Sequence, residues 1–227
     1  MPQVIIINGN IGTGKTTIIN GMIEKLKEQG VKFCLIKEPV GKWMEYGMLD
    51  KFYSDMGKFG YAFETLVFSS KVLSIREQLE NNPDAEVILM ERCMRTDVEI
   101  FMEGLKPKLT STELKMYYDW CYMYRDLLPI DLDNAFQIFI KNSPEVCFER
   151  MNKRKRAGES GVELSYLQFL DKMYDKFIEN TKNKIILESE LVGKDYTENG
   201  KDKESTINLI WKMARLDSTS PKPLTII

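Results

Sequence analysis

One nine-residue stretch near the N-terminus constrains this chain more than any other feature. Gly9-Asn10-Ile11-Gly12-Thr13-Gly14-Lys15-Thr16-Thr17 has a glycine, four residues and then Gly-Lys-Thr, which is the spacing of a phosphate-binding loop. Glycines let backbone N–H groups point inward at an anion, and the start of the following helix adds its unpaired donors. We therefore predict a nucleoside-triphosphate site, with Lys15 reaching the β and γ phosphates and the Thr16 hydroxyl binding Mg²⁺.

The flanks of this loop support the prediction. Residues 4–8 are a β-branched apolar run typical of a strand buried on both faces, and residues 16–29 repeat apolar positions at helical spacing. The competing interpretation is a Gly-rich strand-to-helix turn with a chance lysine. The complete spacing, with a strand before it and a helix after it, favours the phosphate-binding loop.

Length and composition set the broad class. The 227 residues fit one α/β domain, predicted at 1–217, followed by a loose C-terminal tail at 218–227. A net charge of −2 favours neither nucleic acid nor an anionic membrane as partner, and no apolar run is long enough to predict a membrane span or a targeting segment. Four cysteines without a C-x-x-C pair favour reduced thiols in the cytoplasm. The absence of histidine leaves carboxylates, Lys, Tyr or Cys for acid–base chemistry.

Strands and helices alternate along the chain. Further strands are predicted at 31–37, 86–90, 135–140 and 185–187. Helices are predicted over 42–79 with a break at Gly57 and Gly60, from the Thr110 capping box to Leu127, after Ser143 and Pro144, over 165–181 and around 206–214. A loop is expected at 106–109. This alternation implies a parallel sheet with right-handed crossovers.

Charged side chains follow two of the predicted strands, at the same edge of the sheet as the phosphate-binding loop. Glu38 follows the second strand, Glu91 and Arg92 follow the third, and the phosphate-binding loop follows the first. A phosphotransferase needs a metal held by a hydroxyl and a carboxylate, a group that takes the acceptor's proton, and cations against the transferred phosphoryl group. Thr16 with Glu91 can bind the metal, Glu38 can act as the base and Arg92 can supply positive charge. Solvated strand ends or helix-flanking charges are the simpler interpretation of each residue alone.

A basic stretch at 150–156 precedes Gly158 and Gly161. We interpret residues of about 150–162 as a phosphate-binding lid. A solvated helix face or a nuclear-import patch is the alternative.

Several of these motifs together resemble the deoxynucleoside kinases of the deoxycytidine/deoxyguanosine kinase type. They are, in order, residues 9–17; Glu38-Pro39-Val40 with Trp43; Glu91-Arg92-Cys93 followed by Asp97 and Phe101; Tyr118-Asp119-Trp120; and Cys147 through Arg150, Arg154, Arg156 and Glu159 to Tyr166-Leu167. The resemblance spans roughly residues 4–187. It implies the P-loop kinase fold with five parallel strands, subunits paired as a homodimer through helices, and ATP-dependent phosphorylation of a deoxyribonucleoside 5′-hydroxyl in nucleotide salvage. ATP or another NTP would be the donor, with Mg²⁺.

The resemblance also implies residue roles. Glu38 would be the base at the 5′-hydroxyl with Arg92 supporting it, while Lys15, Arg154 and Arg156 would hold phosphates and Arg150 would lie over the donor's adenine. Trp43, Phe63 and Phe101 would enclose the nucleobase, and Tyr53 and Glu159 would bind the 3′-hydroxyl. The chain departs from the family, which usually has Gln at position 64, Arg at 71, Ser at 93 and an acidic residue at 158.

The departure at position 64 bears on nucleobase preference. An ionised Glu64 only accepts hydrogen bonds, so it matches the adjacent ring N–H and amino donors of guanine better than cytosine, unless desolvation protonates it. We therefore expect deoxyguanosine to be used at least as well as deoxycytidine. Lys71 can either donate to the guanine carbonyl or pair with Asp97. The alternative for Glu64 is that it turns to solvent or to a lysine.

Two other functions share parts of this pattern. A thymidylate or other nucleoside monophosphate kinase would need extra cations for a phosphorylated acceptor, whereas Glu38 faces the acceptor here. A P-loop switch that hydrolyses its nucleotide would need a water-positioning residue and no closed aromatic pocket. The aromatic residues at 43, 53, 63 and 101 disfavour the switch, although such side chains often belong to a core.

Overall fold

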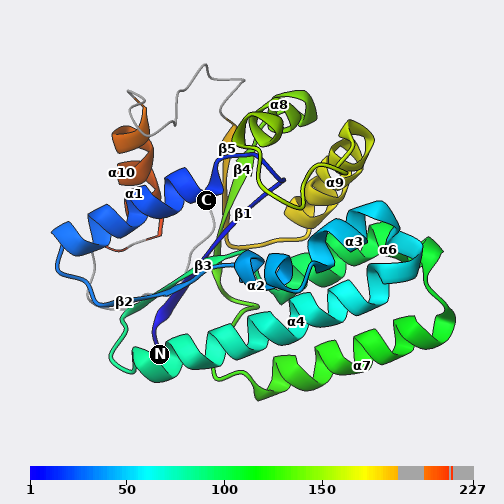
Figure 1. The fold of residues 1–227 in the computed structure, drawn as a ribbon. Helices are drawn as coiled ribbons and strands as arrows, with labels where there is room; N and C mark the ends of the chain where they lie inside the picture. Colours follow the sequence, from blue (N-terminus) through cyan, green and yellow to red (C-terminus); the bar gives the residue numbers. More distant parts are fainter. Residues whose placement is uncertain (189–201, 215, 217–227) are drawn as a thin grey trace.

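A five-stranded parallel sheet forms the centre of the computed structural model, which describes residues 1–188, 202–214 and 216. The strands are β1 (Gln3–Gly9), β2 (Phe33–Ile36), β3 (Val87–Glu91), β4 (Phe136–Lys141) and β5 (Lys184–Glu188). Their order across the sheet is β2-β3-β1-β4-β5, and every neighbouring pair is parallel. The predicted α/β class with a five-stranded parallel sheet is confirmed. β1 lies in the middle, so the loop that follows it emerges at the centre of the sheet edge (Figure 1).

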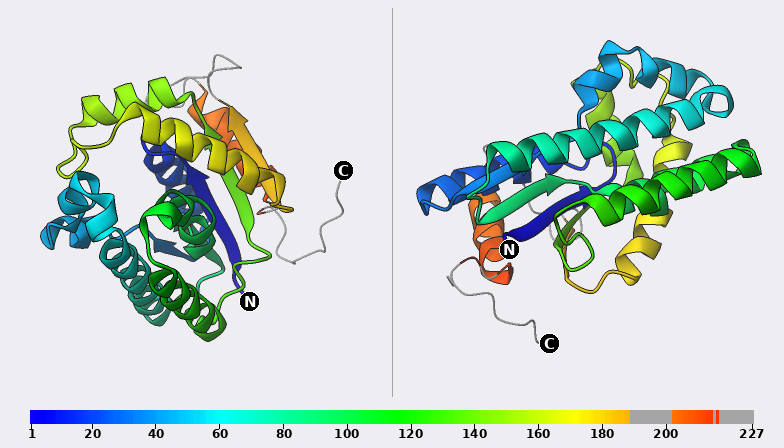
Figure 2. Two further views of the ribbon diagram at one scale, coloured as in Figure 1. Left: turned by 90° about the vertical axis from the view of Figure 1, so that its right-hand side faces the viewer. Right: turned by 90° about the horizontal axis from the view of Figure 1, so that it is seen from below.

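Helices cover both faces of this sheet (Figures 1 and 2). They are α1 (Lys15–Glu28), α2 (Val40–Glu45), α3 (Met48–Ser54), α4 (Met56–Asn81), α5 (Met94–Thr96), the π-helix η1 (Asp97–Phe101), α6 (Met102–Leu105), the 3₁₀-helix η2 (Lys106–Lys108), α7 (Ser111–Leu127), α8 (Pro144–Arg154), α9 (Leu164–Glu179) and α10 (Lys203–Met213). α1 and α10 pack on one face, and α4 and α7 lie on the other. α8 and α9 pack together beside Phe139 of β4.

The central strand shows why its sequence is continuously apolar. Ile5 and Ile7 pack into the cluster under α1 and α10, while Val4 and Ile6 pack into the cluster under α4. Because successive side chains of a strand point to opposite faces, a strand covered on both sides needs apolar residues at every position.

The predicted helix break at Gly57 and Gly60 is wrong. The chain turns earlier, at Gly47 with φ 61° and at Asp55, whose side chain accepts a hydrogen bond of 3.0 Å from the backbone N–H of Lys58 and caps α4. α4 then runs through both glycines for 26 residues. A Cβ at Gly60 would lie 3.1 Å from Leu105 Cδ2, so this glycine allows close packing of α6 against α4.

Other local predictions hold in part. Thr110 and Glu113 form the predicted capping box of α7, and Ser143 caps α8 with Pro144 in its first turn. The expected loop at 106–109 contains the short helix η2. The predicted tail at 218–227 lies outside the described residues. Within the described part of the chain, no helix is both long and apolar enough to cross a membrane.

Candidate active site

The loop after β1 has the backbone that its glycines predict. Gly9, Gly12 and Gly14 have φ of 150°, 82° and 97°, a region that side chains rarely adopt. A Cβ at Gly12 would lie 2.3 Å from the carbonyl oxygen of Cys147 at the start of α8, which backbone packing forbids. Glycine is therefore required at this position by conformation and by space.

Side chains hold the loop in place from within and from outside. The Asn10 amide donates to the Leu167 carbonyl at 2.8 Å, the Thr13 hydroxyl donates to the Asn10 carbonyl at 3.0 Å, and the Asn142 amide donates to the Thr13 carbonyl at 3.0 Å. These three polar side chains are buried. The loop is therefore fixed before any ligand binds, which lowers the entropy cost of binding.

Lys15 folds back over this loop. Its Nζ donates to the Asn10 carbonyl at 3.0 Å and lies 4.0 Å from Glu91 Oε1 at the end of β3. Burial, reinforced by the positive charge of Arg92, lowers the pKa of Lys15 to about 7. An anion in the loop would add negative charge beside the ammonium and favour its charged form.

Arg92 has an unusual backbone conformation, and three hydrogen bonds hold its side chain. Its backbone is left-handed with φ 51°, a conformation that costs roughly 1–2 kcal/mol for a residue with a Cβ. The guanidinium donates to Glu38 Oε2 at 2.6 Å, to the Gly9 carbonyl at 2.9 Å and to the Tyr174 hydroxyl at 2.9 Å. It thereby links β1, β3, α9 and the segment after β2 at one point.

Glu38 is fully paired with cations. Besides Arg92, its Oε1 lies 3.0 Å from Lys71 Nζ, which also donates to Asp97 Oδ1 at 2.6 Å. Burial acts to raise the pKa of Glu38, but the charges of Arg92 and Lys71 outweigh it and lower the pKa to about 2. Glu38 is therefore a carboxylate at any physiological pH.

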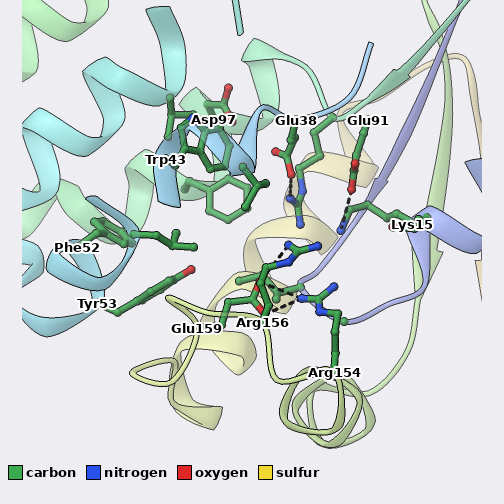
Figure 3. Close-up of a pocket in the computed structure, with 18 of the residues that line it drawn as sticks. Lys15, Glu38, Trp43, Phe52, Tyr53, Glu91, Asp97, Arg154, Arg156 and Glu159 are labelled. Carbon is green, nitrogen blue, oxygen red and sulfur yellow. Dashed lines mark hydrogen bonds and ion pairs between the residues drawn. The ribbon is translucent and has the colours of Figure 1, made fainter. Parts of the chain in front are cut away.

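Lys15, Glu38 and Arg92 face one cavity of about 440 Å³, shown in close-up in Figure 3. Predicted residues that line it are Ile11, Gly12, Gly14, Lys15, Thr16, Thr17, Glu38, Trp43, Tyr53, Phe63, Glu64, Glu91, Arg92, Asp97, Phe101, Arg150, Arg154, Arg156 and Glu159. Gly9, Asn10, Thr13 and Lys71 do not line it. Of the two alternatives for Lys71, the structure shows the pairing with Asp97.

One end of the cavity is aromatic. Trp43 and Phe63 make an edge-to-face contact with ring centroids 5.8 Å apart, and the Trp43 indole N–H donates to the Ser70 hydroxyl at 2.9 Å. Phe52 packs on Phe63 at 4.5 Å, while Phe101 lies under the Arg92 guanidinium at 5.1 Å. The flat faces and the fixed tryptophan suit a planar aromatic ligand.

Glu64 lies in this aromatic end, and of the two protonation states considered for it, burial favours the neutral one at neutral pH. Its side chain is buried, and its hydrogen-bond partner is the Tyr117 hydroxyl at 3.5 Å. Burial, with the nearby negative charge of Asp97, raises the pKa of Glu64 to about 8. The alternative in which Glu64 turns to solvent is excluded by its 3% exposure.

The opposite end of the cavity carries basic residues from the C-terminal part of α8 and from the segment that follows it. Arg154 donates to both oxygens of Glu159 at 2.9 and 2.7 Å, and Arg156 donates to Oε1 at 3.2 Å. Tyr53 comes from α3, across the cavity from Lys15 (Figure 3). Both oxygens of Glu159 are thus occupied by arginines that the sequence predicts to hold phosphates.

Comparison with known proteins identifies the family. A family model described as deoxynucleoside kinase matches residues 5–214. The chain belongs to the deoxynucleoside kinase family. It is 30% identical to a probable deoxycytidine kinase of fowlpox virus over 77% of this chain and 71% of that protein. It is 28% identical to a thymidine kinase of ictalurid herpesvirus 1 (79% and 76% covered) and 26% identical to human mitochondrial thymidine kinase 2 (78% and 64% covered).

Several residues that shape the site of this deoxynucleoside kinase were not predicted from the sequence. Phe52, Leu49 and Val67 line the cavity, and Tyr174 fixes Arg92. At helical spacing these side chains resemble ordinary core positions. Phe52 next to Tyr53 was the available signal, because consecutive residues of a short helix can both reach a wide cavity.

Proposed function

We propose that this kinase transfers the γ-phosphoryl group of ATP or another NTP, with Mg²⁺, to the 5′-hydroxyl of a deoxyribonucleoside. The observation that carries the proposal is the position of the Glu38–Arg92 pair, which faces the same cavity as Lys15 and Thr16 on one side and the aromatic residues on the other. A base, phosphate-binding groups and a pocket for a planar ring are what this reaction needs in one enclosure.

On the donor side, the phosphates would lie in the loop, with Lys15, Arg154 and Arg156 as cations and Arg150 beside the donor's base. Lys15 would gain a counter-charge there in place of the neutral Asn10 carbonyl, closer than Glu91 Oε1, which lies 4.0 Å from its Nζ. Arg154 and Arg156 would exchange Glu159 for phosphate oxygens, and this would free the Glu159 carboxylate for the sugar.

Thr16 and Glu91 fit a magnesium site. Both line the cavity next to the loop, and together they offer a hydroxyl and a carboxylate oxygen. Mg²⁺ is usually held by one or two protein groups with the substrate phosphates and water, so a larger protein cage is not needed. Among the described residues there is no group of three acidic or thiol side chains that would form one. When bound, the ion would neutralise charge on the phosphates.

On the acceptor side, Glu38 would accept a hydrogen bond from the 5′-hydroxyl and take its proton as the new bond forms. A carboxylate with so low a pKa is a weak base, which suits a loose transition state in which the hydroxyl proton is released late. Trp43, Phe63 and Phe101 would pack on the nucleobase, and Tyr53 with Glu159 would bind the 3′-hydroxyl.

The site favours this reaction over the two alternatives. A monophosphate kinase would need free cations at the acceptor end, but Arg92 and Lys71 are both paired with Glu38. A nucleotide-hydrolysing switch gives no reason for the aromatic end of the cavity. Membership in the deoxynucleoside kinase family favours neither alternative.

The test is ATP turnover with each of the four deoxynucleosides, with thymidylate, and without an acceptor. We expect a deoxynucleoside to be phosphorylated and ATP hydrolysis without acceptor to be slow. Deoxycytidine and thymidine are included because relatives carry those names. Turnover that is equal with and without nucleosides would refute the proposal, and so would faster phosphorylation of thymidylate than of any deoxynucleoside.

We also propose that the protein is a homodimer paired through α7. Met116, Trp120, Met123 and Leu127 are 43–68% exposed and repeat along one face of α7, with Leu73 of α4 also exposed. Pairing two copies of this apolar face would remove it from water. Sedimentation of the wild type and of Trp120→Glu tests the idea. The wild type should be a dimer and the variant should dissociate, and a wild-type monomer would refute the proposal. Residues 1–217 as one domain and a cytoplasmic location remain predictions, the second supported by four buried cysteines that form no disulfide in the described structure.

A further inference from the structure

Glu64 is a buried carboxyl group that lines the site and has no cation of its own. It sits on α4 at 3% exposure, and among the described residues no lysine or arginine lies within ion-pair distance of it. The Tyr117 hydroxyl at 3.5 Å is a weak donor at the limit of hydrogen bonding. An ionised carboxylate would be poorly compensated in this position.

The charges around Glu64 explain why no cation is left for it. Glu38 pairs with Arg92 and Lys71, and Lys71 also pairs with Asp97. Two cations therefore already serve two carboxylates, and Oδ2 of Asp97 remains a buried acceptor without a partner. A third negative charge here would meet two others.

Titratable groups from several elements interact electrostatically with Glu64. They are Lys71 of α4 itself, Asp97 of η1, Glu38 after β2, Tyr117 and Cys121 of α7, Tyr53 of α3 and Tyr166 of α9. Lys71 is the one cation among these seven, and it is already shared by Glu38 and Asp97. The surroundings thus favour the protonated form of Glu64.

A protonated carboxyl presents a different hydrogen-bonding pattern from a carboxylate. It offers one donor and one acceptor side by side, as a glutamine amide does, whereas the carboxylate offers acceptors alone. We propose that Glu64 is a base-specificity residue that contacts the nucleobase as a neutral acid at neutral pH and as a carboxylate at higher pH, so that nucleobase preference changes with pH. This inference rests on the proposed function.

The two forms match different base edges. The neutral acid pairs with the adjacent amino donor and ring-nitrogen acceptor of cytosine or adenine, and also with the carbonyl and ring N–H of guanine. The carboxylate loses the first pairing, because one oxygen would face a ring-nitrogen lone pair. It keeps guanine, whose ring N–H and amino group are adjacent donors. Deoxyguanosine can therefore form two hydrogen bonds with either form of Glu64, whereas deoxycytidine can do so with the neutral form alone.

The test is the ratio of kcat/KM for deoxycytidine to that for deoxyguanosine as a function of pH. Titrations of Lys15, of the donor phosphates and of any other shared group cancel in this ratio. With a pKa of about 8 for Glu64, the ratio should be flat from pH 6 to 7 and fall about fourfold by about pH 8.5, below the range in which guanine loses its own proton. In Glu64→Gln the ratio should be flat throughout.

The matched control is Glu80→Gln, which makes the same change on α4 at a side chain that is 71% exposed and pairs only with Arg76 in the described structure. In this variant the ratio of kcat/KM for deoxycytidine to that for deoxyguanosine should change with pH as it does in the wild type. A second readout does not depend on turnover. Calorimetry at pH 8 in buffers of different ionisation enthalpy should show uptake of about half a proton when deoxycytidine binds to the wild type, and none when it binds to Glu64→Gln.

The outcomes separate this inference from the proposed function. A wild-type ratio that does not change with pH, or one that changes equally in Glu64→Gln, would overturn the role of Glu64 while leaving the kinase proposal intact. Binding of deoxycytidine without proton uptake would also overturn it. Failure to phosphorylate any deoxynucleoside at any pH would overturn the proposed function and this inference with it.

Discussion

Replacing Glu38 by glutamine removes the charge at the centre of the site and keeps its size. In the wild type, Glu38 accepts from Arg92 at 2.6 Å and pairs with Lys71 at 3.0 Å, both within a buried cluster. Glutamine can still accept with its one oxygen, but its NH₂ group must then face the other cation. The variant would therefore lose the proposed base and also leave positive charge uncompensated.

The loss of the base should lower the rate, and the uncompensated positive charge should lower the stability. A proton-transfer role is typically worth about 10²–10⁴-fold in rate, so kcat should fall by at least about a hundredfold. Removing one partner of a buried ion pair costs about 3–5 kcal/mol of stability. We expect a value near the lower limit, about 3 kcal/mol, because Lys71 keeps its hydrogen bond to Asp97.

The assay must separate these effects. Steady-state kcat and KM, deoxynucleoside affinity by calorimetry, and urea unfolding should be measured for Glu38→Gln and for the exposed control Glu80→Gln. Affinity should change little, since the side chain keeps its shape. Because the pKa of Glu38 lies near 2, its protonation should give no acid limb in kcat/KM above about pH 4. A fall in kcat of less than tenfold in folded Glu38→Gln would show that this residue is not the base.

The remaining predictions concern the donor, the sugar and stability. Lys15→Ala and Thr16→Ala should each abolish phosphoryl transfer while calorimetric affinity for the deoxynucleoside survives, and wild-type kcat in either would remove the loop from the mechanism. Deoxyribose should be preferred over ribose by about ten- to a hundredfold in kcat/KM, because a 2′-hydroxyl would be buried unmatched beside Tyr53 and Glu159; equal values for cytidine and deoxycytidine would count against it. The pKa of Glu64 is raised on folding, so its contribution to stability is full below about pH 4.5 and is lost as pH rises through about 8, by at most about 5 kcal/mol. The free energy of unfolding, measured with urea, should therefore decline less between these pH values in Glu64→Gln than in the wild type. Equal slopes in the two proteins would contradict the argument.

The parts of the fold and site that the sequence predicts follow from general geometry. The spacing of the loop predicts which positions need glycine. Gly12 is an example, because its φ is positive and any side chain there would also clash with the Cys147 carbonyl. Parallel strands end at a common edge, so Glu38 and Arg92 could be brought together without knowledge of their contacts. Their separation of 2.6 Å and the turn at Arg92 that allows it could not be predicted from spacing.

The features that the sequence missed depend on tertiary contacts. Gly60 looks like a helix break locally, but it faces Leu105 from another helix, and packing outweighs its propensity. Tyr174 looks like a core residue of α9 until Arg92 reaches its hydroxyl. The sequence allowed for protonation of Glu64 by desolvation but could not decide it, because the outcome depends on how many cations the folded site leaves for this carboxyl.

Glu38 and Glu64 are both buried carboxyl groups of one cavity, yet their pKa values are shifted in opposite directions, to about 2 and about 8. The difference comes from the two cations Arg92 and Lys71, which both contact Glu38 and leave Glu64 without an ion pair in the described structure. Groups whose environments separate their pKa values in this way commonly take separate roles. Under the proposed function, the charged carboxylate would orient and deprotonate the acceptor hydroxyl, and the neutral one would meet the donors and acceptors of the base edge. Lys71 thus supports both roles without lining the cavity: it keeps Glu38 ionised, and by pairing with Asp97 as well it is not available to Glu64.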